Sequence, residues 1–407
     1  MMEYGLLGRK LGHSFSPQIH KMIGGYDYGL FEREPDTLAD FFANGTFKGI
    51  NVTIPYKKDV IPFCHTLSPQ AAEIGSVNTI RRMPDGTYFG DNTDYYGFLY
   101  MIKSSGVSVA GKKCVLFGDG GVAPTVRTAL RDLGAAEVVT VSRKGENNFS
   151  NLHRHYDAAI LVNATPVGTY PNNGVSVTEL APFTKLEAAY DLVYNPALTE
   201  FLRQAKELGA VAVNGLGMLV AQAKRAVEIF LDTEISDDVI ETVRKKIAAQ
   251  NMNIALVGMA GSGKTTTGKA LAERLGREFV DTDELINQFG CRPIPDIIQY
   301  EGEEVFRGIE TYTLSEMAKR SGLVIATGGG IVTRPENLPL LRQNSVTILL
   351  HRPVEDLPSD GRPLSQKYGV KELYEKRKPM YEAFGEYKVE CTGVEETVDQ
   401  ILEVLGL

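Results

Sequence analysis

Short apolar runs that end in glycine-rich or polar turns alternate with helical patterns along the chain. The runs are rich in Val, Ile and Leu, and an unbroken apolar run is typical of a strand that is buried on both faces of a parallel sheet. Six of them are CVLFGDGG (114–121), EVVTVSR (137–143), AAILVNATP (158–166), AAYDLVYNP (188–196), NIALVGMAGSGKT (253–265) and LVIATGGG (323–330). Strand, loop and helix repeated in this way predict an α/β protein with parallel sheets.

Two of the predicted strands open into glycine-rich loops of the phosphate-binding type, at residues 118 and 258. We expect each strand to begin its own nucleotide-binding sheet. Between the two loops, residues 224–253 have a helical and charged pattern without a strand signal, so we place a domain boundary near Gln250 to Asn253. A length of 407 residues allows two or three domains at about 150 residues each.

Composition and charge narrow the class of protein. Hydrophobic residues make up 43% and charged residues 23%, which excludes a disordered or fibrous chain. A net charge of −8 gives no overall basic field for nucleic acid or an anionic membrane. The cysteines, at positions 64, 114, 291 and 391, form no CxxC pair, which suits a reducing compartment. With no signal-peptide pattern and no long apolar stretch, we expect a cytoplasmic protein.

Residues 258–265, GMAGSGKT, fit the phosphate-loop pattern GxxxxGK[ST] between an apolar strand and a helix. Small residues let backbone N–H groups surround a phosphate, and the helix N-terminus adds partial positive charge. We expect Lys264 to reach the β- and γ-phosphates of ATP and Thr265 to offer its hydroxyl to Mg²⁺. The candidate ATP-binding residues are Gly258, Gly261, Ser262, Gly263, Lys264, Thr265 and Thr266.

Two carboxylates follow in FVDTDELI (279–286), at the end of a predicted strand. In extended chain, Asp281 and Asp283 point to the same side. One would join the Mg²⁺ shell, and the other would contact or deprotonate an acceptor hydroxyl. The alternative is a helix N-cap followed by a solvated acid.

Four more motifs follow along the chain: EVFRGIE (304–310), ATGGG (326–330), DGRPL (360–364) and KRKPMY (376–381). Arginines occur in three of them, and one further candidate arginine lies in the same part of the chain. Phosphoryl transfer needs positive charge on the moving phosphate, and a carboxylated acceptor needs a guanidinium partner. The candidates are Arg307, Arg362, Arg377 and Arg352, although each alone is more often a surface charge.

Over residues 253–407 the motifs GMAGSGKTT, DTD, FRxxE, TGGG, GRPL and RKPMY resemble the shikimate kinase family in order and spacing. Gluconate kinase shares the phosphate loop, but FRxxE and TGGG favour shikimate kinase. The resemblance implies that Arg362 lies on a mobile lid and stabilises the transferred phosphate, that Lys264 holds ATP, and that Thr265 and Asp281 organise Mg²⁺. It implies that shikimate is bound by Asp283, Arg307, Gly329, Gly330 and Arg377, the two arginines on its carboxylate.

In the first half, GDGGVA (118–123) is a variant of the dinucleotide fingerprint GxGxxG/A, with Gly118, Gly120, Gly121 and Ala123 as its small residues. An NAD site wants an acid at the end of the next strand, about 20 residues further on. This chain has Ser142, Arg143 and Lys144 there, and two cations favour the 2′-phosphate of NADP(H); the alternative is a basic turn. Asp119 would weaken coenzyme binding unless it caps the helix.

Polar loops surround the predicted dinucleotide domain, in GHSFSP (12–17), NVTIPYKKDV (51–60), SVNT (76–79), GDNTDYYGF (90–98) and NGLGMLVAQA (214–223). In α/β enzymes such loops hold the substrate, although a single Ser or Asn is more often a turn or cap residue. A Lys beside an Asp is a plausible pair for the proton that accompanies hydride transfer. Candidates to bind a polyhydroxy carboxylate are Ser14, Ser16, Asn51, Thr53, Lys57, Asn78, Asp94 and Gln222.

These five blocks, in this order, resemble the shikimate dehydrogenase family over residues 1–250. The resemblance implies a catalytic dyad of Lys57 and Asp94, with Thr165 and Met218 near the nicotinamide. It implies that Ser14 and Ser16 take the carboxylate of the substrate, and that its hydroxyls are bound by Asn51, Thr53, Asn78 and Gln222. Quinate/shikimate dehydrogenase is the close rival, and Arg143 and Lys144 argue against an NAD-using quinate enzyme.

The implied domains are residues 1–103 with 215–250 for 3-dehydroshikimate or shikimate, 104–214 for NADP(H), and 251–407 for the kinase. The two resemblances were found separately, yet they name consecutive reactions. We therefore expect a bifunctional enzyme of aromatic amino-acid biosynthesis that reduces 3-dehydroshikimate with NADPH and phosphorylates the 3-hydroxyl of shikimate with MgATP. The alternative is that one half is a degenerate binding or regulatory module. The expected partners are these small molecules, without nucleic acid or membrane, and the oligomeric state is left open.

Overall fold

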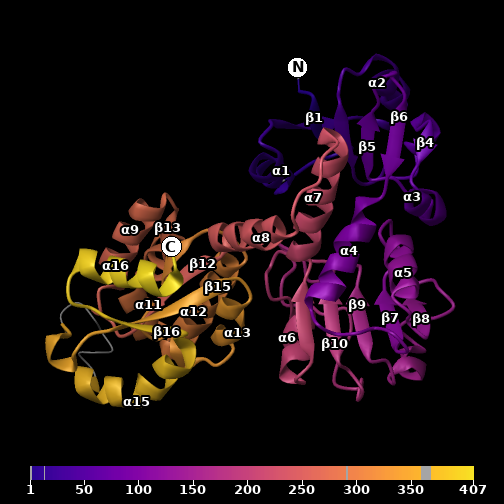
Figure 1. Ribbon diagram of the computed structural model, residues 1–407. Helices are drawn as coiled ribbons and strands as arrows, with labels where there is room; N and C mark the ends of the chain where they lie inside the picture. Colours follow the sequence, from indigo (N-terminus) through magenta and orange to yellow (C-terminus); the bar gives the residue numbers. More distant parts are fainter. Residues whose placement is uncertain (1, 13, 290–291, 359–367) are drawn as a thin grey trace. The chain divides into compact units, whose positions relative to one another are not determined.

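The computed structural model describes residues 2–12, 14–289, 292–358 and 368–407. The chain forms two compact units, one of residues 1–194 and 199–248, the other of residues 195–198 and 249–407. Each unit is described by itself (Figure 1). Among the described residues, no helix combines the length and the apolar character needed to cross a bilayer.

The first sheet of the first unit is mixed. Its order is β2-β1-β3-β5-β6-β4, in which β1 pairs parallel with β2 and β3, whereas β5 runs antiparallel to β3 and β6. The strands are β1 (Tyr4–Gly8), β2 (Tyr28–Glu32), β3 (Gly49–Val52), β4 (Thr66–Leu67), β5 (Thr79–Arg82) and β6 (Tyr88–Asp91). They are short and carry glycine or charged residues, so none of them stands out as an unbroken apolar run.

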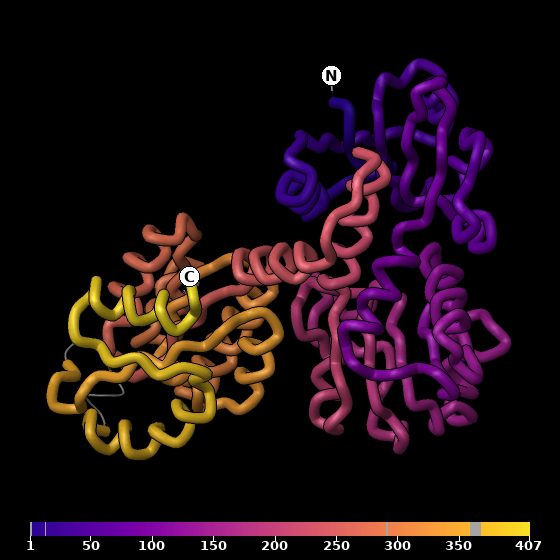
Figure 2. Tube along the Cα trace, in the orientation of Figure 1, coloured from indigo at the N-terminus to yellow at the C-terminus, as the bar shows by residue number. Residues whose placement is uncertain are grey.

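Helices cover both faces of this sheet. The shorter ones are α1 (Ser16–Gly24), α2 (Leu38–Asn44) and α3 (Pro69–Ile74). Phe41 and Phe42 of α2 pack with Ile50 on one face. On the other face, Phe230 of α7 (Leu216–Leu231) packs with Tyr4 and Tyr28. The trace of the chain shows this late helix returning to the N-terminal segment (Figure 2), so the first sheet is completed by a segment about 200 residues downstream.

The second sheet of the first unit is parallel, with the order β11-β10-β9-β7-β8. Its strands are β7 (Lys113–Phe117), β8 (Glu137–Val141), β9 (Ile160–Asn163), β10 (Ala188–Asp191) and β11 (Val211–Asn214). Four of the five strands, β7 to β10, form within predicted apolar runs, which confirms those predictions, whereas β11 was not predicted. The associated helices are α4 (Thr93–Ser104), α5 (Ala123–Asp132) and α6 (Glu200–Glu207).

The charged segment expected to be helical consists of two helices. α7 ends at Leu231, its C-cap residue Asp232 has a left-handed backbone with φ of 53°, and α8 (Asp238–Asn251) follows a short turn. The turn is held by Lys224, whose ammonium lies 2.7 Å from Glu228 and 2.9 Å from Asp237. A helical charge pattern alone does not reveal such a break.

The second unit contains a parallel sheet with the order β13-β14-β12-β15-β16. Ala255 and Val257 of β12 (Asn253–Val257) pack on one face with α12 and α15, whereas Ile254 and Leu256 pack on the other with α9 and α16. The other strands are β13 (Phe279–Asp281), β14 (Val324–Ala326), β15 (Ser345–His351) and β16 (Tyr387–Glu390). The helices are α9 (Lys264–Leu275), α10 (Thr282–Phe289), α11 (Ile294–Tyr300), α12 (Glu303–Ala318), α13 (Asn337–Arg342), α15 (Val370–Phe384) and α16 (Val394–Leu405).

These sheets confirm the predicted α/β class. Both phosphate-type loops follow the strand that comes first along the chain in its own sheet, β7 in one unit and β12 in the other. The strands of the mixed sheet with their antiparallel pairs around β5, and the strands β11, β15 and β16, were not predicted from the sequence.

Gly97 controls the approach of α4 to α7. A Cβ at this position would lie 2.6 Å from the carbonyl oxygen of Met218 and 3.0 Å from the Cβ of Gln222. Gly97→Ala should force the two helices apart and lower the free energy of unfolding of the first unit by about 1–3 kcal/mol, measured by urea denaturation.

Gly217→Ala is the matched control, since a Cβ there meets nothing nearer than 3.8 Å. Because alanine favours a helix over glycine by about 1 kcal/mol, this control should be neutral or stabilising. Equal stability of the two variants would contradict the close contact.

Candidate active sites

Lys57 and Asp94 meet in the first unit although they lie on different elements. Lys57 follows β3, and Asp94 is the second residue of α4, whose N-terminus is capped by the Asn92 side chain. The Lys57 Nζ lies 2.5 Å from Asp94 Oδ2, and the two side chains are 17% and 13% exposed. The pair is therefore shielded from bulk solvent but still reachable by a small molecule.

A cavity of about 290 Å³ surrounds this ion pair. Its lining includes the predicted residues Ser14, Ser16, Asn51, Thr53, Lys57, Asn78, Asp94, Met218 and Gln222. The residues that the sequence analysis missed are Leu6, Val52, Val122, Leu192, Tyr194, Gly215 and Leu219. Leu192 and Tyr194 lie in the apolar run 188–196, whose pattern predicts a buried strand and not a cavity wall. The strand β10 ends at Asp191, so both residues follow it and line the cavity.

Hydrogen bonds orient the polar lining of the cavity. Tyr28 donates its hydroxyl to Asn51 Oδ1 over 2.8 Å, and the Thr93 amide donates to Asn78 Oδ1 over 2.6 Å. The Thr93 hydroxyl also lies 3.4 Å from Gln222 Oε1. Three predicted amide side chains are thus contacted by two residues that were not candidates: Tyr28 lies outside every quoted motif, and Thr93 lies in GDNTDYYGF (90–98) but was given no role there.

The glycine turn after β7 is built around Gly118. Its φ of 103° is left-handed, and a Cβ would lie 2.9 Å from the Thr165 side chain. Its amide donates to Val141 O of β8 over 2.9 Å. A Cβ at Gly120 or Gly121 would meet nothing within 4 Å, so these two glycines leave the mouth of the turn open.

A buried carboxylate ties the neighbouring loops together. Asp191, at the end of β10, accepts hydrogen bonds from Asn163 Nδ2 at 2.9 Å, the Val193 amide at 3.0 Å and the Thr199 hydroxyl at 2.6 Å. Asn163 Oδ1 in turn accepts from the Thr165 amide and hydroxyl. Burial raises the pKa of Asp191 to about 6 despite these hydrogen bonds. Thr165, the predicted neighbour of the nicotinamide, is therefore held in place by Asp191 through Asn163, and Asp191 was not among the predicted site residues.

The predicted 2′-phosphate residues follow β8 directly, and Arg143 and Lys144 are exposed. Asp119 does not cap α5: the N-cap position is Val122, without a side-chain hydrogen bond. That alternative was wrong, because Asp119 lies 3.2 Å from the Arg127 guanidinium instead.

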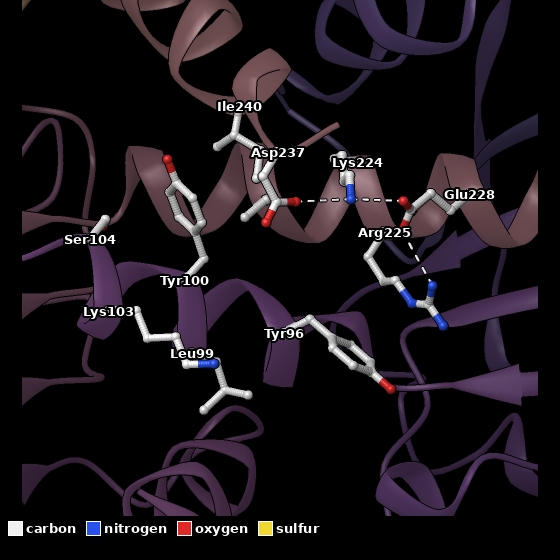
Figure 3. A pocket seen from close by; sticks show the side chains of 11 residues that line it. Tyr96, Leu99, Tyr100, Lys103, Ser104, Lys224, Arg225, Glu228, Asp237 and Ile240 are labelled. Atoms are coloured by element: carbon white, nitrogen blue, oxygen red, sulfur yellow. Dashed lines mark hydrogen bonds and ion pairs between the residues drawn. The ribbon is translucent and has the colours of Figure 1, made fainter. Parts of the chain in front are cut away.

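A larger cavity, of about 560 Å³, lies between α4 and α7 away from the dyad (Figure 3). Tyr96, Tyr100 and Lys103 line it from the face of α4 opposite Asp94, as follows from the helical repeat. Lys224 lines it from α7 within its ion pairs to Glu228 and Asp237 (Figure 3). None of the predicted site residues contributes to this cavity.

In the second unit, the glycine loop after β12 adopts a backbone that only glycine tolerates easily. Gly258, Gly261 and Gly263 have φ of 149°, 87° and 97°. The Lys264 ammonium donates to the carbonyls of Gly258 and Met259 at 2.9 and 2.8 Å, so it closes the loop on itself. The buried Ser262 Oγ has no hydrogen-bond partner within the described chain. Such an orphaned hydroxyl fits a loop that is completed by a ligand.

Asp281 and Asp283 do not share an extended segment. β13 ends at Asp281, and Asp283 lies in the first turn of α10, so the expectation that both point to one side of a strand was wrong. Asp281 Oδ1 accepts from the Asp283 amide at 3.0 Å, whereas its Oδ2 accepts from the Thr265 hydroxyl at 2.7 Å. Asp281 therefore acts as a helix cap and also holds the predicted magnesium residue Thr265.

Arg307 sits in a buried charge cluster under the TGGG loop. Its guanidinium lies 2.7 Å from Glu310 and 3.0 Å from Glu303, and Glu310 is 1% exposed. A Cβ at Gly330 would overlap this guanidinium, and Arg377 Nη1 donates to Gly329 O over 3.2 Å. The cluster brings the predicted arginines and glycines together.

Asp283 faces the same cluster. Its Oδ1 is buried without a hydrogen-bond partner in the described part of the chain. Burial, reinforced by the negative charge of Glu310, raises the pKa of Asp283 to about 6. No role was predicted for Glu310, although it lies in the motif EVFRGIE. It forms an ion pair with Arg307, and its negative charge helps to raise the pKa of Asp283.

Two further arginines were candidates. Arg362 lies outside the described residues. Arg352 follows β15 and lines a separate cavity of about 190 Å³ with Tyr374 and Lys378. It is therefore not part of the cluster around Arg307.

Two family models match the chain. The shikimate dehydrogenase substrate binding domain matches residues 6–80, and shikimate kinase matches residues 260–406. The first match contains Ser14, Lys57 and Asn78, and the second contains most of the glycine loop.

Known proteins similar to this chain cover its N-terminal part. The shikimate dehydrogenase (NADP(+)) of Clostridium perfringens is 37% identical over 270 residues, which are 60% of this chain and 99% of that protein. A solved chorismate mutase/shikimate 5-dehydrogenase fusion protein from Clostridium acetobutylicum is 36% identical with a TM-score of 0.57, covering 60% of this chain and 96% of that one. The shikimate 5-dehydrogenase of Thermus thermophilus, solved with NADP(H) and shikimate, is 31% identical with a TM-score of 0.54, covering 60% and 99%.

These matches agree with the dyad cavity and the glycine turn of the first unit, and with the phosphate loop of the second. The chain therefore belongs to the shikimate dehydrogenase family and carries a shikimate kinase domain after it, so that one polypeptide combines a shikimate dehydrogenase with a shikimate kinase.

Proposed function

We propose that the Lys57–Asp94 pair carries the proton transfer in the reduction of 3-dehydroshikimate. Bound NADPH supplies a hydride to the C3 carbonyl carbon. The Lys57 ammonium donates a proton to the carbonyl oxygen, which becomes the 3-hydroxyl of shikimate, and Lys57 is reprotonated from solvent. Asp94 accepts a hydrogen bond from the neighbouring hydroxyl and orients the ammonium. The single observation that carries this proposal is the 2.5 Å ion pair inside the cavity.

The polar lining of the cavity binds the rest of the substrate. Ser14 and Ser16, whose hydroxyls lie 3.1 Å apart, take the carboxylate. The ring hydroxyls are bound by Asn51, Thr53, Asn78 and Gln222. Because the amides of Asn51 and Asn78 are already oriented by Tyr28 and Thr93, little side-chain entropy is lost on binding.

The coenzyme lies along the carboxyl ends of β7, β8 and β9 within the proposed NADP(H) domain, residues 104–214. The open mouth at Gly120 and Gly121 admits the pyrophosphate, and Ala123 allows close packing of α5. Ser142, Arg143 and Lys144 bind the 2′-phosphate, and Thr165 and Met218 face the nicotinamide. Residues 1–103 with 215–250 form the substrate domain.

The proposed kinase domain, residues 251–407, binds MgATP on the glycine loop. ATP supplies the phosphoryl group, and Mg²⁺ neutralises its charge. Backbone amides of the loop, Lys264 and Thr266 hold the phosphates, and Thr265 with Asp281 holds the metal shell. The orphaned Ser262 hydroxyl and the left-handed glycines support this fit.

Asp283 is the base of the kinase reaction. It accepts the proton of the shikimate 3-hydroxyl as that oxygen bonds to the γ-phosphorus of ATP, while the bond from the γ-phosphorus to the bridging oxygen breaks and ADP leaves. Arg307 and Arg377 bind the carboxylate of shikimate, and Gly329 and Gly330 allow the ring to approach. By the family resemblance, Arg362 stabilises the transferred phosphate.

The second candidate function is a chain with one active half. Nothing in either cluster favours it, because the ion pair of Lys57 and the base Asp283 are both half-buried in formed sites. With both halves active, the shikimate formed by the dehydrogenase is the substrate of the kinase. We place the enzyme in the cytoplasm, where NADPH and ATP are available and its cysteines stay reduced.

The decisive experiment supplies the purified chain with 3-dehydroshikimate, NADPH and MgATP. The expected result is accumulation of shikimate 3-phosphate with one NADPH and one ATP consumed for each product molecule. Accumulation of shikimate alone, or no reaction until shikimate is added, would show that one half is inactive.

Lys57→Ala should lower kcat of the dehydrogenase reaction by roughly 10²–10⁴-fold, because the proton donor is lost. Phosphorylation of added shikimate should keep its wild-type rate, which also reports that the chain is folded. Lys58→Ala removes an exposed lysine next in sequence and is the matched control. A Lys57→Ala enzyme with more than a tenth of wild-type kcat would contradict the proposed role.

The kinase reaction should lose activity as pH falls through about 6, because the raised pKa of Asp283 makes its carboxyl protonated and unable to accept the hydroxyl proton below that pH. One unit below the pKa, about a tenth of the molecules keep the base ionised, so kcat/KM for shikimate should fall about tenfold. Glu310→Gln removes the negative charge that raises this pKa and should move the profile to lower pH. A pH profile that is flat from 7 to about 5 would rule out Asp283 as the base.

A further inference from the structure

We propose that Asp119 and Arg127 form a coenzyme-selectivity pair, in which Arg127 masks a carboxylate that would otherwise oppose the 2′-phosphate of NADPH. The inference rests on the coenzyme site proposed above. Asp119 is the one acidic residue of the turn 118–123, and its Oδ1 lies 3.2 Å from Arg127 Nη1. A carboxylate at the mouth of a phosphate-binding turn needs such a partner to avoid repelling the coenzyme.

Strand pairing places Asp119 beside the 2′-phosphate residues. β7 and β8 pair in parallel with Phe117 opposite Val141, and the Gly118 amide donates to Val141 O over 2.9 Å. Asp119 and Ser142 are therefore the residues that follow this last contact on neighbouring strands. In a dinucleotide fold the adenosine ribose lies at this edge, between the glycine turn and the end of the second strand.

The Arg127 guanidinium bridges the same two strands. It belongs to the second turn of α5, and Nη1 also lies 3.5 Å from the hydroxyl of Thr140 in β8. Its side chain is 33% exposed, against 68% for Arg131 one turn further along the helix. Arg127 thus lies toward the mouth of the turn, whereas Arg131 lies 3.9 Å from Glu73.

The two states of Asp119 favour different coenzymes. Unmasked, its carboxylate would repel the 2′-phosphate of NADPH and would accept a hydrogen bond from the ribose hydroxyl of NADH, as the acid of an NAD site does. Paired with Arg127, it presents no net charge to the ribose. Selectivity for NADPH then depends on Arg127 as well as on Arg143 and Lys144.

A double-mutant cycle measures this dependence. The wild type, Arg127→Ala, Asp119→Ala and the double variant are compared by kcat/KM for NADPH and for NADH at low ionic strength. Arg127→Ala should lower the NADPH/NADH ratio by roughly tenfold or more. The double variant Arg127→Ala with Asp119→Ala should have an NADPH/NADH ratio of kcat/KM within about threefold of wild type.

The cycle includes its own controls. Arg131→Ala removes a cation from the same helix and should leave the ratio unchanged, and added salt should shrink the effect of Arg127→Ala because the charges are partly exposed. Phosphorylation of shikimate by each variant reports folding.

The outcomes separate this inference from the proposed coenzyme site. A wild type that uses NADH as well as NADPH would refute the proposed 2′-phosphate site itself. A wild type that prefers NADPH, with an unchanged ratio in Arg127→Ala, would overturn the masking pair alone. A double variant as impaired as Arg127→Ala would also overturn it, because Arg127 would then act without Asp119.

Discussion

The hydrogen-bonded ladders that join β7 to β8 and β9, and β12 to β14 and β15, bring the carboxyl ends of neighbouring strands to one edge of each sheet. Backbone groups of these buried strands have no water to bind, so the pairing is obligatory and its register is kept. This pairing fixes the positions of the glycine turns, of the basic residues after β8 and of the TGGG loop after β14. Each candidate site of the parallel sheets is therefore made of residues that are distant in sequence but adjacent in strand order.

Most of this could be predicted, because the parallel sheets are built from unbroken apolar runs and their loops carry glycine at positions that only glycine tolerates. Gly118, Gly258 and Gly263 have left-handed backbones, and their spacing in the sequence reflects that requirement. Lys57 and Asp94 lie on different elements, yet the family resemblance names them together as a dyad, and their side chains lie 2.5 Å apart. The mixed sheet escaped prediction because its strands are short and contain charged or glycine residues; Thr79–Arg82, for example, has two buried residues followed by two arginines.

What escaped prediction in the sites is the supporting layer. Tyr28 and Thr93 orient amides that line the cavity around Lys57, and Glu310 forms an ion pair with Arg307. Thr93 and Glu310 lie inside quoted motifs, but neither was predicted to contact these partners. The end of β13 at Asp281 was also missed, since a strand and the first turn of a helix read alike over three residues. Contacts between side chains on different elements depend on the tertiary structure. A sequence pattern predicts such a contact only where the sequence resembles a known family.

The buried Asp191 has one more consequence. Because a single carboxylate holds Asn163, the Val193 amide and the Thr199 hydroxyl, the loops after β9 and β10 and the first turn of α6 share one anchor. Thr199 also caps that helix through the Leu202 amide. These three segments cannot open one at a time without leaving a buried polar group unpaired. They therefore form a single cooperative unit, and opening any one of them alone would cost the free energy of the buried hydrogen bonds that the other two keep.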